Sequence, residues 1–140
     1  MSADDFIDSN VFIYQLDSAA TRKQTIADSI VRRALADGSG CISHQVVQEC
    51  LNTALRKAAV RLQPAEARPW LDVVLLPLMK VGPTPALYQR ALGVQERWDF
   101  SFYDSLIVAA AMQAGCSRLL TEDLQHGQQI ETLTVHNPFA

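Results

Sequence analysis

The sequence predicts an α/β fold in which helices flank a central parallel sheet of about five strands. Short apolar runs of strand type alternate with segments of helical periodicity along all 140 residues. A hydrophobic content of 49% with 19% charged residues is typical of a folded globular protein, and no repeat, low-complexity tract or Gly/Ser linker divides the chain. We therefore expect residues 1–140 to form a single domain with a sizeable core.

The first expected strand ends at Phe6 and Ile7, directly before the polar residues Asp8, Ser9 and Asn10. A segment that could begin a helix follows. Ligands of open parallel sheets collect outside the carboxyl ends of the strands, so Asp8 is a candidate ligand. Taken alone, the same three polar residues also fit an ordinary helix N-cap.

The next helix is expected over Arg22–Leu35, where the apolar residues fall on one stripe and Gly38 is placed to end the helix. Cys41 and Ile42 are expected to form a short second strand. Ser43 can cap a third helix. We expect that helix to bury the following residues at helical spacing: Val46, Val47, Cys50, Leu51, Ala54, Leu55 and Ala58.

Glu49 lies outside the buried stripe of this third helix. Its flank continues to Thr53 and Arg56, with Lys57 and Arg61 further along, so an acid near a strand end leads into a basic ridge. For the basic residues alone, a solvated helix face is the better interpretation.

Pro64 and Pro69 are expected to break the helical pattern that precedes the middle of the chain. A short apolar helix is then expected over Leu71–Leu78, followed by a candidate third strand over Leu78–Val81.

Two capped helices are expected in the second half. Thr84 followed by Pro85 is a good helix opening, and Ser101 with Asp104 fits a capping box in which Asp104 reaches back to Ser101. The nearly all-apolar segment Ser105–Ala114 indicates that the second of these helices packs directly on the sheet. The first should run to about Trp98, with a core face of Leu87, Tyr88, Ala91, Leu92 and Trp98.

Gly115 is placed to stop that buried helix. Arg118–Thr121 is the fourth expected strand, and Glu122 and Asp123 lie at its end as Asp8 does on the first. Thr132–His136 is expected as the fifth strand.

Four acids thus lie just past strand ends or in the first turns of the helices that follow: Asp8, Glu49, Asp104 and Asp123. Right-handed crossovers place these strand ends at one edge of a parallel sheet, so the acids should converge. Two carboxylates ~4 Å apart repel by ~4 kcal/mol at an effective dielectric of about 20. No lysine or arginine lies at these strand ends in the sequence, so a cation is needed to join the acids.

The chemistry of this acidic group favours Mg²⁺ or Mn²⁺ over zinc, because hard cations prefer carboxylate oxygens and retain open positions for water or phosphate. Such a site can neutralise a phosphodiester, activate a water for in-line attack and stabilise the departing oxygen. The net charge of -3 gives no global attraction to nucleic acid. A polyanionic partner would therefore be held by a local basic patch or by the bound cation.

The location is expected to be cytoplasmic. Cys41, Cys50 and Cys116 are odd in number and widely spaced among apolar neighbours, which is typical of core residues in a reducing compartment. Acids at positions 4 and 5 stand where a secretory signal would carry lysines, and no segment approaches membrane-spanning length.

Four segments resemble, in order and spacing, the four motifs of PIN domains, and the match spans essentially the whole chain. They are Phe6-Ile7-Asp8-Ser9-Asn10, Val46-Val47-Gln48-Glu49-Cys50, Phe102-Tyr103-Asp104-Ser105-Leu106-Ile107-Val108-Ala109-Ala110-Ala111 and Leu119-Leu120-Thr121-Glu122-Asp123-Leu124. The closing Asn137-Pro138-Phe139 is similar to the end of one VapC-type subgroup.

The resemblance implies a PIN-like three-layer fold, a Mg²⁺- or Mn²⁺-dependent ribonuclease active site, and the toxin role in a bacterial toxin–antitoxin pair. It also implies an RNA substrate, a homodimer, and inhibition by an antitoxin whose C-terminal segment lies along the toxin groove, commonly pointing a basic side chain at the acids. It assigns Asp8, Glu49, Asp104 and Asp123 to the metal-binding and catalytic quartet, with Ser9, Asn10 and Thr121 as polar support.

One assignment within the motifs stays open on the residues alone. The Thr-x-Asp spacing of the family favours Asp123 over Glu122, whereas strand alternation could choose either. The three histidines, His44, His126 and His136, have no counterpart in the quartet. A lone histidine near a strand end is more often a hydrogen-bonded structural residue, so none is given a role.

Other classes of protein are compatible with parts of this pattern. A receiver-like signalling module usually needs adjacent acids after its first strand and a lysine after its last, whereas this chain has Asp8-Ser9-Asn10 and then His136-Asn137. A catalytically inactive PIN-like module that binds RNA or protein would keep the fold, and only the completeness of the quartet speaks against it. Singly, each acid fits a cap, a solvated face or a turn. Only their joint placement favours a metal site.

Overall fold

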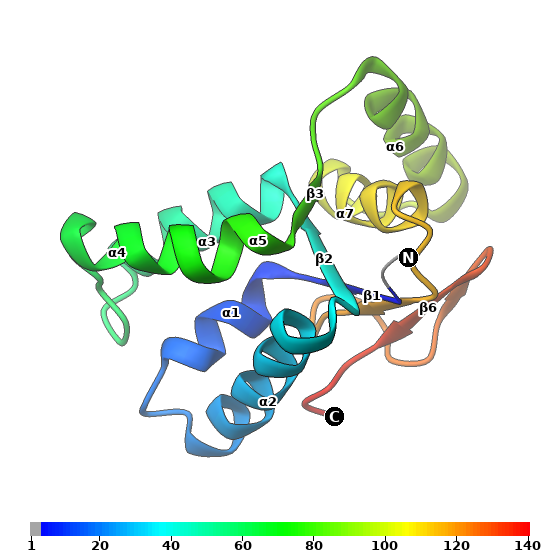
Figure 1. Ribbon diagram of the computed structural model, residues 1–140. Helices are drawn as coiled ribbons and strands as arrows, with labels where there is room; N and C mark the ends of the chain where they lie inside the picture. Colours follow the sequence, from blue (N-terminus) through cyan, green and yellow to red (C-terminus); the bar gives the residue numbers. More distant parts are fainter. Residues whose placement is uncertain (1–3) are drawn as a thin grey trace.

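The computed structural model describes residues 4–140, and within them a six-stranded sheet has the order β3-β2-β1-β4-β6-β5 (Figure 1). The strands are β1 (Asp5–Ile7), β2 (Gly40–Ser43), β3 (Met79–Val81), β4 (Arg118–Leu120), β5 (Gln129–Ile130) and β6 (Leu133–His136). All neighbouring pairs are parallel except β5 with β6. The predicted α/β fold with a central parallel sheet is confirmed. The additional strand is β5, which is too short to show a pattern in the sequence.

Helices cover both faces of the sheet. They are α1 (Ser9–Leu16), α2 (Thr21–Asp37), α3 (His44–Arg56), α4 (Pro64–Trp70), the π-helical segment η1 (Leu71–Leu75), α5 (Leu76–Leu78), α6 (Pro85–Trp98) and α7 (Phe102–Gln113). Figure 1 shows α1 and α2 on one side of the sheet and α7, backed by α6, on the other. Three layers result, as the PIN-like interpretation predicted.

Local capping chemistry sets most helix ends where the sequence predicted them. The hydroxyl of Ser43 accepts from the N–H of Val46 at the start of α3 (3.4 Å), and the Thr84 hydroxyl accepts from the N–H of Leu87 at the start of α6 (3.1 Å). Gly38 ends α2 with φ 71°, a left-handed conformation that glycine adopts without steric cost. These predictions are confirmed.

The core lies between the sheet and the helices on its two faces. Phe6 of β1, Phe12 of α1 and Leu119 of β4 are fully buried. Every residue of α7 from Ser105 to Ala111 is also buried, so this helix packs directly on the sheet as predicted. Its first turn is thereby held at the strand ends. None of the helices in residues 4–140 is both long and apolar enough to cross a membrane.

The predicted break at Pro69 is wrong, because helical structure runs from Pro64 to Leu78 without interruption. Pro64 occupies the first turn of α4, where its missing N–H costs nothing. Pro69 lies inside α4, and the chain then widens into the π-helical turns of η1. At this junction the N–H of Leu71 donates to the carbonyls of both Ala67 and Arg68. The helix can therefore continue past Pro69 although proline has no N–H to donate.

Some predicted core positions are also wrong. Helix α3 ends at Arg56, so Ala58 lies in an exposed turn beyond the helix and Leu55 is exposed as well. On α6, Tyr88 is 43% and Leu92 52% exposed. That helix packs on α7 and not on the sheet, so it buries a narrower stripe than the apolar pattern suggested.

The capping box at α7 forms only in part. The hydroxyl of Ser101 accepts from the N–H of Asp104 (3.1 Å), which confirms the cap. Among the hydrogen bonds of the described residues, the return bond from the Ser101 N–H to the Asp104 carboxylate is absent, so that half of the prediction is wrong. The carboxylate of Asp104 is therefore available for another role.

Candidate active site

Asp8 lies directly after β1 and is also the N-cap of α1. Its Oδ1 accepts from the N–H of Ser9 (2.7 Å), and its Oδ2 accepts from the hydroxyl of Thr121 (2.8 Å). The residue is only 4% exposed. The pKa of Asp8 is raised to about 7, mainly by burial. The two hydrogen bonds act in the opposite direction, and the nearby charges of Asp123 and Glu49 act in the same direction as burial. Asp8 is therefore the N-cap of α1, and its place after β1 also agrees with the ligand role that the sequence allowed.

Glu49 projects from the second turn of α3 toward the start of α1. The hydroxyl of Ser9 donates to its Oε1 at 3.4 Å. Burial raises the pKa of Glu49, and the charges of Asp123 and Asp104 raise it further. Together with its effect on Asp8, this places Glu49 within electrostatic range of all three other acids.

Asp123 follows β4 across a short turn. Its Oδ2 accepts from the side-chain amide of Asn10 (3.3 Å), and its N–H donates to the hydroxyl of Thr121 (3.1 Å). The pKa of Asp123 is raised by partial desolvation and by the charges of Asp104 and Glu122. Asp104, from the first turn of α7, thus faces both Glu49 and Asp123.

The neighbouring acid, Glu122, turns away from this group. It accepts a 2.7 Å hydrogen bond from the hydroxyl of Tyr14 and a 3.1 Å charged hydrogen bond from the ammonium of Lys23. Strand alternation alone could place either Glu122 or Asp123 in the acidic group. In the structure, Asp123 is the one whose carboxylate contacts Asn10.

The expectation that no basic residue lies at these strand ends is wrong. Lys23 in α2 reaches the end of β4 through Glu122, although 99 positions separate the two residues. Tyr14 and Lys23 look in the sequence like ordinary helix-face residues, and no local signal could have identified this contact.

The structure brings the four predicted acids to one edge of the sheet, and three polar residues form hydrogen bonds to three of them, Asp8, Glu49 and Asp123. Asn10 donates to both Thr121 (3.2 Å) and Asp123, while Thr121 donates to Asp8 and Ser9 to Glu49. Ser9, Asn10 and Thr121 thus each contact at least one of the acids that the resemblance assigned them to support.

The side chains at this edge offer carboxylate and amide oxygens, the donor type that a hard divalent cation prefers. Among residues 4–140, no three His, Cys, Asp or Glu side chains come together closely enough to enclose a metal ion by themselves. Mg²⁺ usually keeps several waters and binds one or two carboxylates directly, so loosely spaced acids suit it. The side-chain oxygen of Asn10 is a buried acceptor without a protein partner in the described structure, and it lies beside these acids. Such an acceptor suits a water of the cation's shell.

The predicted basic ridge begins in α3, the helix that carries Glu49, with Arg56 as its last helical residue, and it continues into Lys57 and Arg61 beyond the helix. Arg56 and Lys57 line an open depression together with Asn52 and Thr53. Nζ of Lys57 also lies 3.9 Å from Oδ2 of Asp17. The ridge is therefore accessible and continuous with the flank that carries Glu49.

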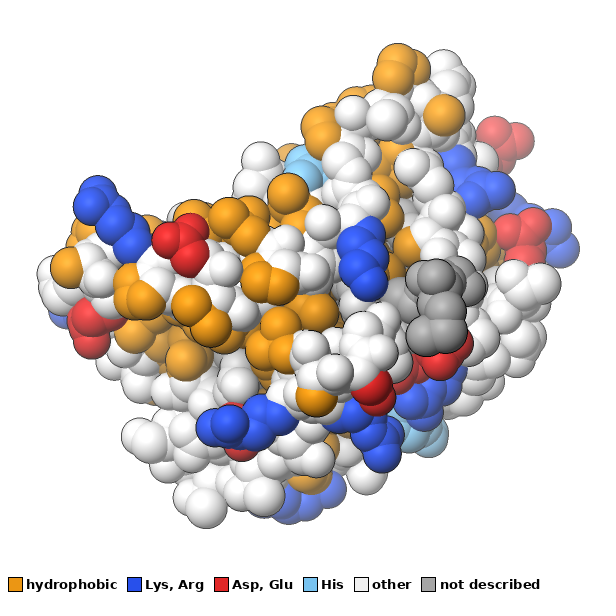
Figure 2. Space-filling view, in the orientation of Figure 1, with side chains coloured by type: hydrophobic (Ala, Val, Ile, Leu, Met, Phe, Trp, Pro, Cys, Tyr) orange, Lys and Arg blue, Asp and Glu red, His pale blue; other side chains and the backbone are white. Residues whose placement is uncertain are grey.

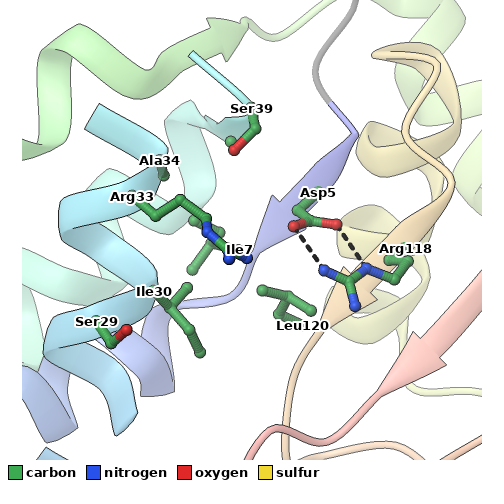
Figure 3. Close-up of a pocket in the computed structure, with 10 residues that line it drawn as sticks. Asp5, Ile7, Ser29, Ile30, Arg33, Ala34, Ser39, Arg118 and Leu120 are labelled. Carbon is green, nitrogen blue, oxygen red and sulfur yellow. Dashed lines mark hydrogen bonds and ion pairs between the residues drawn. The ribbon is translucent and has the colours of Figure 1, made fainter. Parts of the chain in front are cut away.

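A partly open pocket of about 130 Å³ lies between α2 and the strands β1, β2 and β4, and none of the four acids lines it. Figure 3 shows Asp5 and Arg118 beside it, joined by two hydrogen bonds of 2.8 and 2.9 Å between adjacent strands. Since both oxygens of Asp5 are already paired, this pocket offers no free carboxylate. The four acids at the sheet edge form the candidate site.

Two of the three histidines, His126 and His136, have structural contacts. Nδ1 of His126 accepts from the N–H of Asn137 (2.9 Å), and its ring lies 5.2 Å from that of His136. Burial lowers the pKa of His136, as does the nearby charge of Arg118.

Comparison with known proteins places these features in a family. The PIN domain family model matches residues 6–128. The fold is similar to a toxin–antitoxin complex from Klebsiella pneumoniae, with 17% identity, 96% of this chain and 98% of that chain covered, and a TM-score of 0.69. It is also similar to VapC20 from Mycobacterium tuberculosis, described as a sarcin-ricin loop cleaving toxin (20% identity, 86% and 90% covered, TM-score 0.64).

A third similar structure is FitAcB from Neisseria gonorrhoeae, with 22% identity, 96% and 98% coverage and a TM-score of 0.63. The comparison with curated proteins gave no match. At these identities the solved structures establish a shared fold, and the family match spans most of the chain. The chain therefore belongs to the PIN domain family.

Proposed function

We propose that this chain is a metal-dependent endoribonuclease that hydrolyses RNA phosphodiesters and acts as the toxin of a VapBC-type toxin–antitoxin pair. Membership of the PIN domain family supports the nuclease. Two of the similar structures are described as a toxin–antitoxin complex and as a toxin. The observation that carries the proposal is the gathering of Asp8, Glu49, Asp104 and Asp123, whose charges act on one another at one edge of the sheet.

In this proposal the same four carboxylates hold Mg²⁺ or Mn²⁺. A bound cation supplies neutralisation of the phosphodiester and lowers the pKa of a water for attack. Asp8 is fixed before any ligand arrives, because Ser9 and Thr121 hold its two oxygens. Asn10 joins Thr121 to Asp123 and so keeps the ends of β1 and β4 in register around the reacting phosphate.

The RNA backbone would run from the acids onto the basic ridge of α3. Arg56, Lys57 and Arg61 supply the positive charge that the chain as a whole, at -3, does not. A cognate antitoxin would insert a basic side chain among the acids, because a lysine or arginine there relieves the same repulsion as a cation.

Substitution of Asp104 tests the proposal. We expect Asp104→Asn to reduce Mg²⁺-dependent RNA cleavage by about 10–100-fold, because a carboxylate oxygen is lost from the metal environment while the Ser101 cap is kept. Cleavage of a labelled RNA is measured with and without Mg²⁺. Asp37→Asn, at the far end of α2, is the matched control and should cleave like the wild type.

Two outcomes would contradict the proposal. Unchanged metal-dependent cleavage by the Asp104→Asn variant would remove Asp104 from the mechanism. RNA binding by the wild type without any cleavage in Mg²⁺ or Mn²⁺ would favour the inactive binding module.

A further inference from the structure

Both carboxylate oxygens of Glu122 are held by residues from two helices. The hydroxyl of Tyr14 in α1 donates to Oε1 at 2.7 Å, and the ammonium of Lys23 in α2 donates to Oε2 at 3.1 Å. Lys23 also donates to the hydroxyl of Tyr14 at 3.1 Å, so the three side chains form a closed triangle.

Aromatic packing keeps this triangle in place. The ammonium of Lys23 lies 4.5 Å from the ring centroid of Tyr14 and 5.6 Å from that of Phe139. The two rings meet edge to face at 4.9 Å, and Arg22 donates twice to the Phe139 carbonyl at 3.1 Å. The triangle is therefore held from α1, α2 and the C-terminal segment.

Three consecutive residues after β4 have three different anchors. Thr121 donates to Asp8, Glu122 is held by the triangle, and Asp123 accepts from Asn10. Glu122 and Asp123 lie together in the bend that follows β4, so the contacts that hold Glu122 toward Tyr14 also restrict the backbone that carries Asp123 beside Asn10.

We propose that Glu122 is a positioning residue, which Tyr14 and Lys23 hold so that Asp123 stays in the acidic site. Glu122 itself does not ligate the cation. This inference rests on the proposed function, since it concerns the position of one of the metal-binding carboxylates.

Mn²⁺ binding tests this assignment independently of cleavage. Free Mn²⁺ is measured by electron paramagnetic resonance during titration of the metal-free full chain. We expect Glu122→Ala to weaken Mn²⁺ affinity by about tenfold, as is typical for residues that orient a ligand. Glu122→Gln should fall between the wild type and Glu122→Ala, because its amide oxygen still accepts from Tyr14. Glu96→Ala, an exposed acid on α6, is the control and should bind like the wild type.

The possible results separate the roles. A loss in Glu122→Gln as large as that in Asp123→Asn would make Glu122 a ligand and overturn the proposal. A lower melting temperature with unchanged Mn²⁺ affinity in Glu122→Ala would reduce the triangle to a purely structural contact. If Glu122→Ala does not fold, Lys23→Met keeps the Tyr14 bond and should weaken Mn²⁺ binding in the same direction. Failure of the wild type to bind Mn²⁺ would instead defeat the proposed function.

A separate observation concerns two buried cysteines. Cys41 in β2 and Cys116 in the turn before β4 place their sulfur atoms 3.4 Å apart, although 75 positions separate them in the chain. Both thiols are free and buried. The third cysteine, Cys50, instead points toward the carbonyl oxygen of Ser9, with a distance of 4.0 Å.

We infer that Cys41 and Cys116 form a disulfide when the protein meets a peroxide. With hydrogen peroxide as the oxidant, one thiolate attacks a peroxide oxygen and becomes a sulfenic acid, while the O–O bond breaks and the departing hydroxide is protonated to water. The second sulfur then displaces the hydroxyl group of the sulfenic acid as another water and forms the S–S bond. The two thiols are oxidised by two electrons and the peroxide is reduced. The bond would tie β2 to the entry of β4, on either side of β1.

Intact mass spectrometry of the full chain treated with hydrogen peroxide tests this inference. We expect the loss of two hydrogens, a peptide containing both Cys41 and Cys116, and a melting temperature higher by about 10 °C that dithiothreitol reverses, because a long loop is closed. Cys50→Ser should behave in the same way, and Cys116→Ser should not form the bond. Oxygen addition without loss of hydrogens, or a disulfide that contains Cys50, would overturn the inference.

Discussion

Asp8 combines a structural and a chemical role in one buried side chain. It caps α1 through the N–H of Ser9 and accepts from Thr121, yet burial and the acids around it raise its pKa to about 7. A group with such a raised pKa in the folded state holds a proton that the unfolded chain releases at lower pH. Its ionisation in the absence of a cation therefore opposes folding.

The raised pKa of Asp8 predicts how the stability of the protein depends on pH. In metal-free buffer the free energy of unfolding should fall as pH rises from about 4 to about 7, because the unfolded Asp8 ionises first, and the loss should reach the order of 4 kcal/mol. Added Mg²⁺ should restore stability at pH 8. Thermal melts of the wild type and Asp8→Asn measure both effects, and the variant should show a flatter pH dependence. A wild type that is most stable at pH 8 without metal would contradict the prediction.

Asp104 allows a second test at the scale of the residue. Its carboxylate does not complete the capping box, and its charge raises the pKa of both Glu49 and Asp123. In metal-free buffer, Asp104→Asn should therefore melt at the same temperature as the wild type or a few degrees higher, because repulsion is relieved. Differential scanning calorimetry measures the melting temperatures of the two proteins. A melting temperature lower by several degrees would show that the carboxylate supports the helix cap after all.

At the scale of the elements, the sequence predicted what local chemistry controls. Ser43, Thr84 and Gly38 end or begin helices because their own side chains or backbone freedom satisfy the helix ends. Asp8, Asp104 and Asp123 could be located for the same reason, since each follows a strand or lies in the first turn of a helix, whereas Glu49 lies one turn further along α3. The triangle of Tyr14, Lys23 and Glu122 could not be predicted, because it joins residues 99 and 108 positions apart. The exposure of Leu92 likewise depends on the element that α6 packs against. The helical pattern of the sequence does not identify that element.

The packing of α2 on the sheet gives a prediction for one element. A Cβ added to Gly40 in β2 would lie 2.6 Å from the Cβ of Ala34 in α2 and 3.0 Å from Cδ1 of Ile7. Gly40→Ala should therefore lower the free energy of unfolding by about 1–3 kcal/mol, because α2 has to move away from the sheet. Urea denaturation measures this change.

Gly93 provides the matched control for that measurement. It lies within α6, and a Cβ there would meet nothing within 4 Å. Gly93→Ala should raise the free energy of unfolding by about 1 kcal/mol, because alanine loses less backbone entropy in a helix. Equal effects of the two substitutions would show that α2 does not pack closely on β2.

At the scale of the whole molecule, the acids occupy only one edge, and an apolar surface lies elsewhere. Val73, Leu76 and Met79 are exposed along η1, α5 and β3, with Val73 66% exposed. Figure 2 shows hydrophobic side chains gathered along this part of the molecule. Single exposed apolar residues are normal on a protein surface, whereas a contiguous run of them indicates an interaction site.

We expect this run to pair with a second copy of the chain, as in the homodimer that the resemblance to PIN domains implies. Because Val73 and Leu76 come from consecutive turns of one helical segment, the same surface on both copies can pack about a two-fold axis. The double variant Val73→Asp, Leu76→Asp should be monomeric by light scattering at a concentration where the wild type is a dimer, since burying unpaired carboxylates opposes association. Leu92→Asp, on the exposed side of α6, is the comparison. If Leu92→Asp abolishes the dimer and the double variant does not, the interface lies on α6, and a wild type that is monomeric throughout would contradict the homodimer itself.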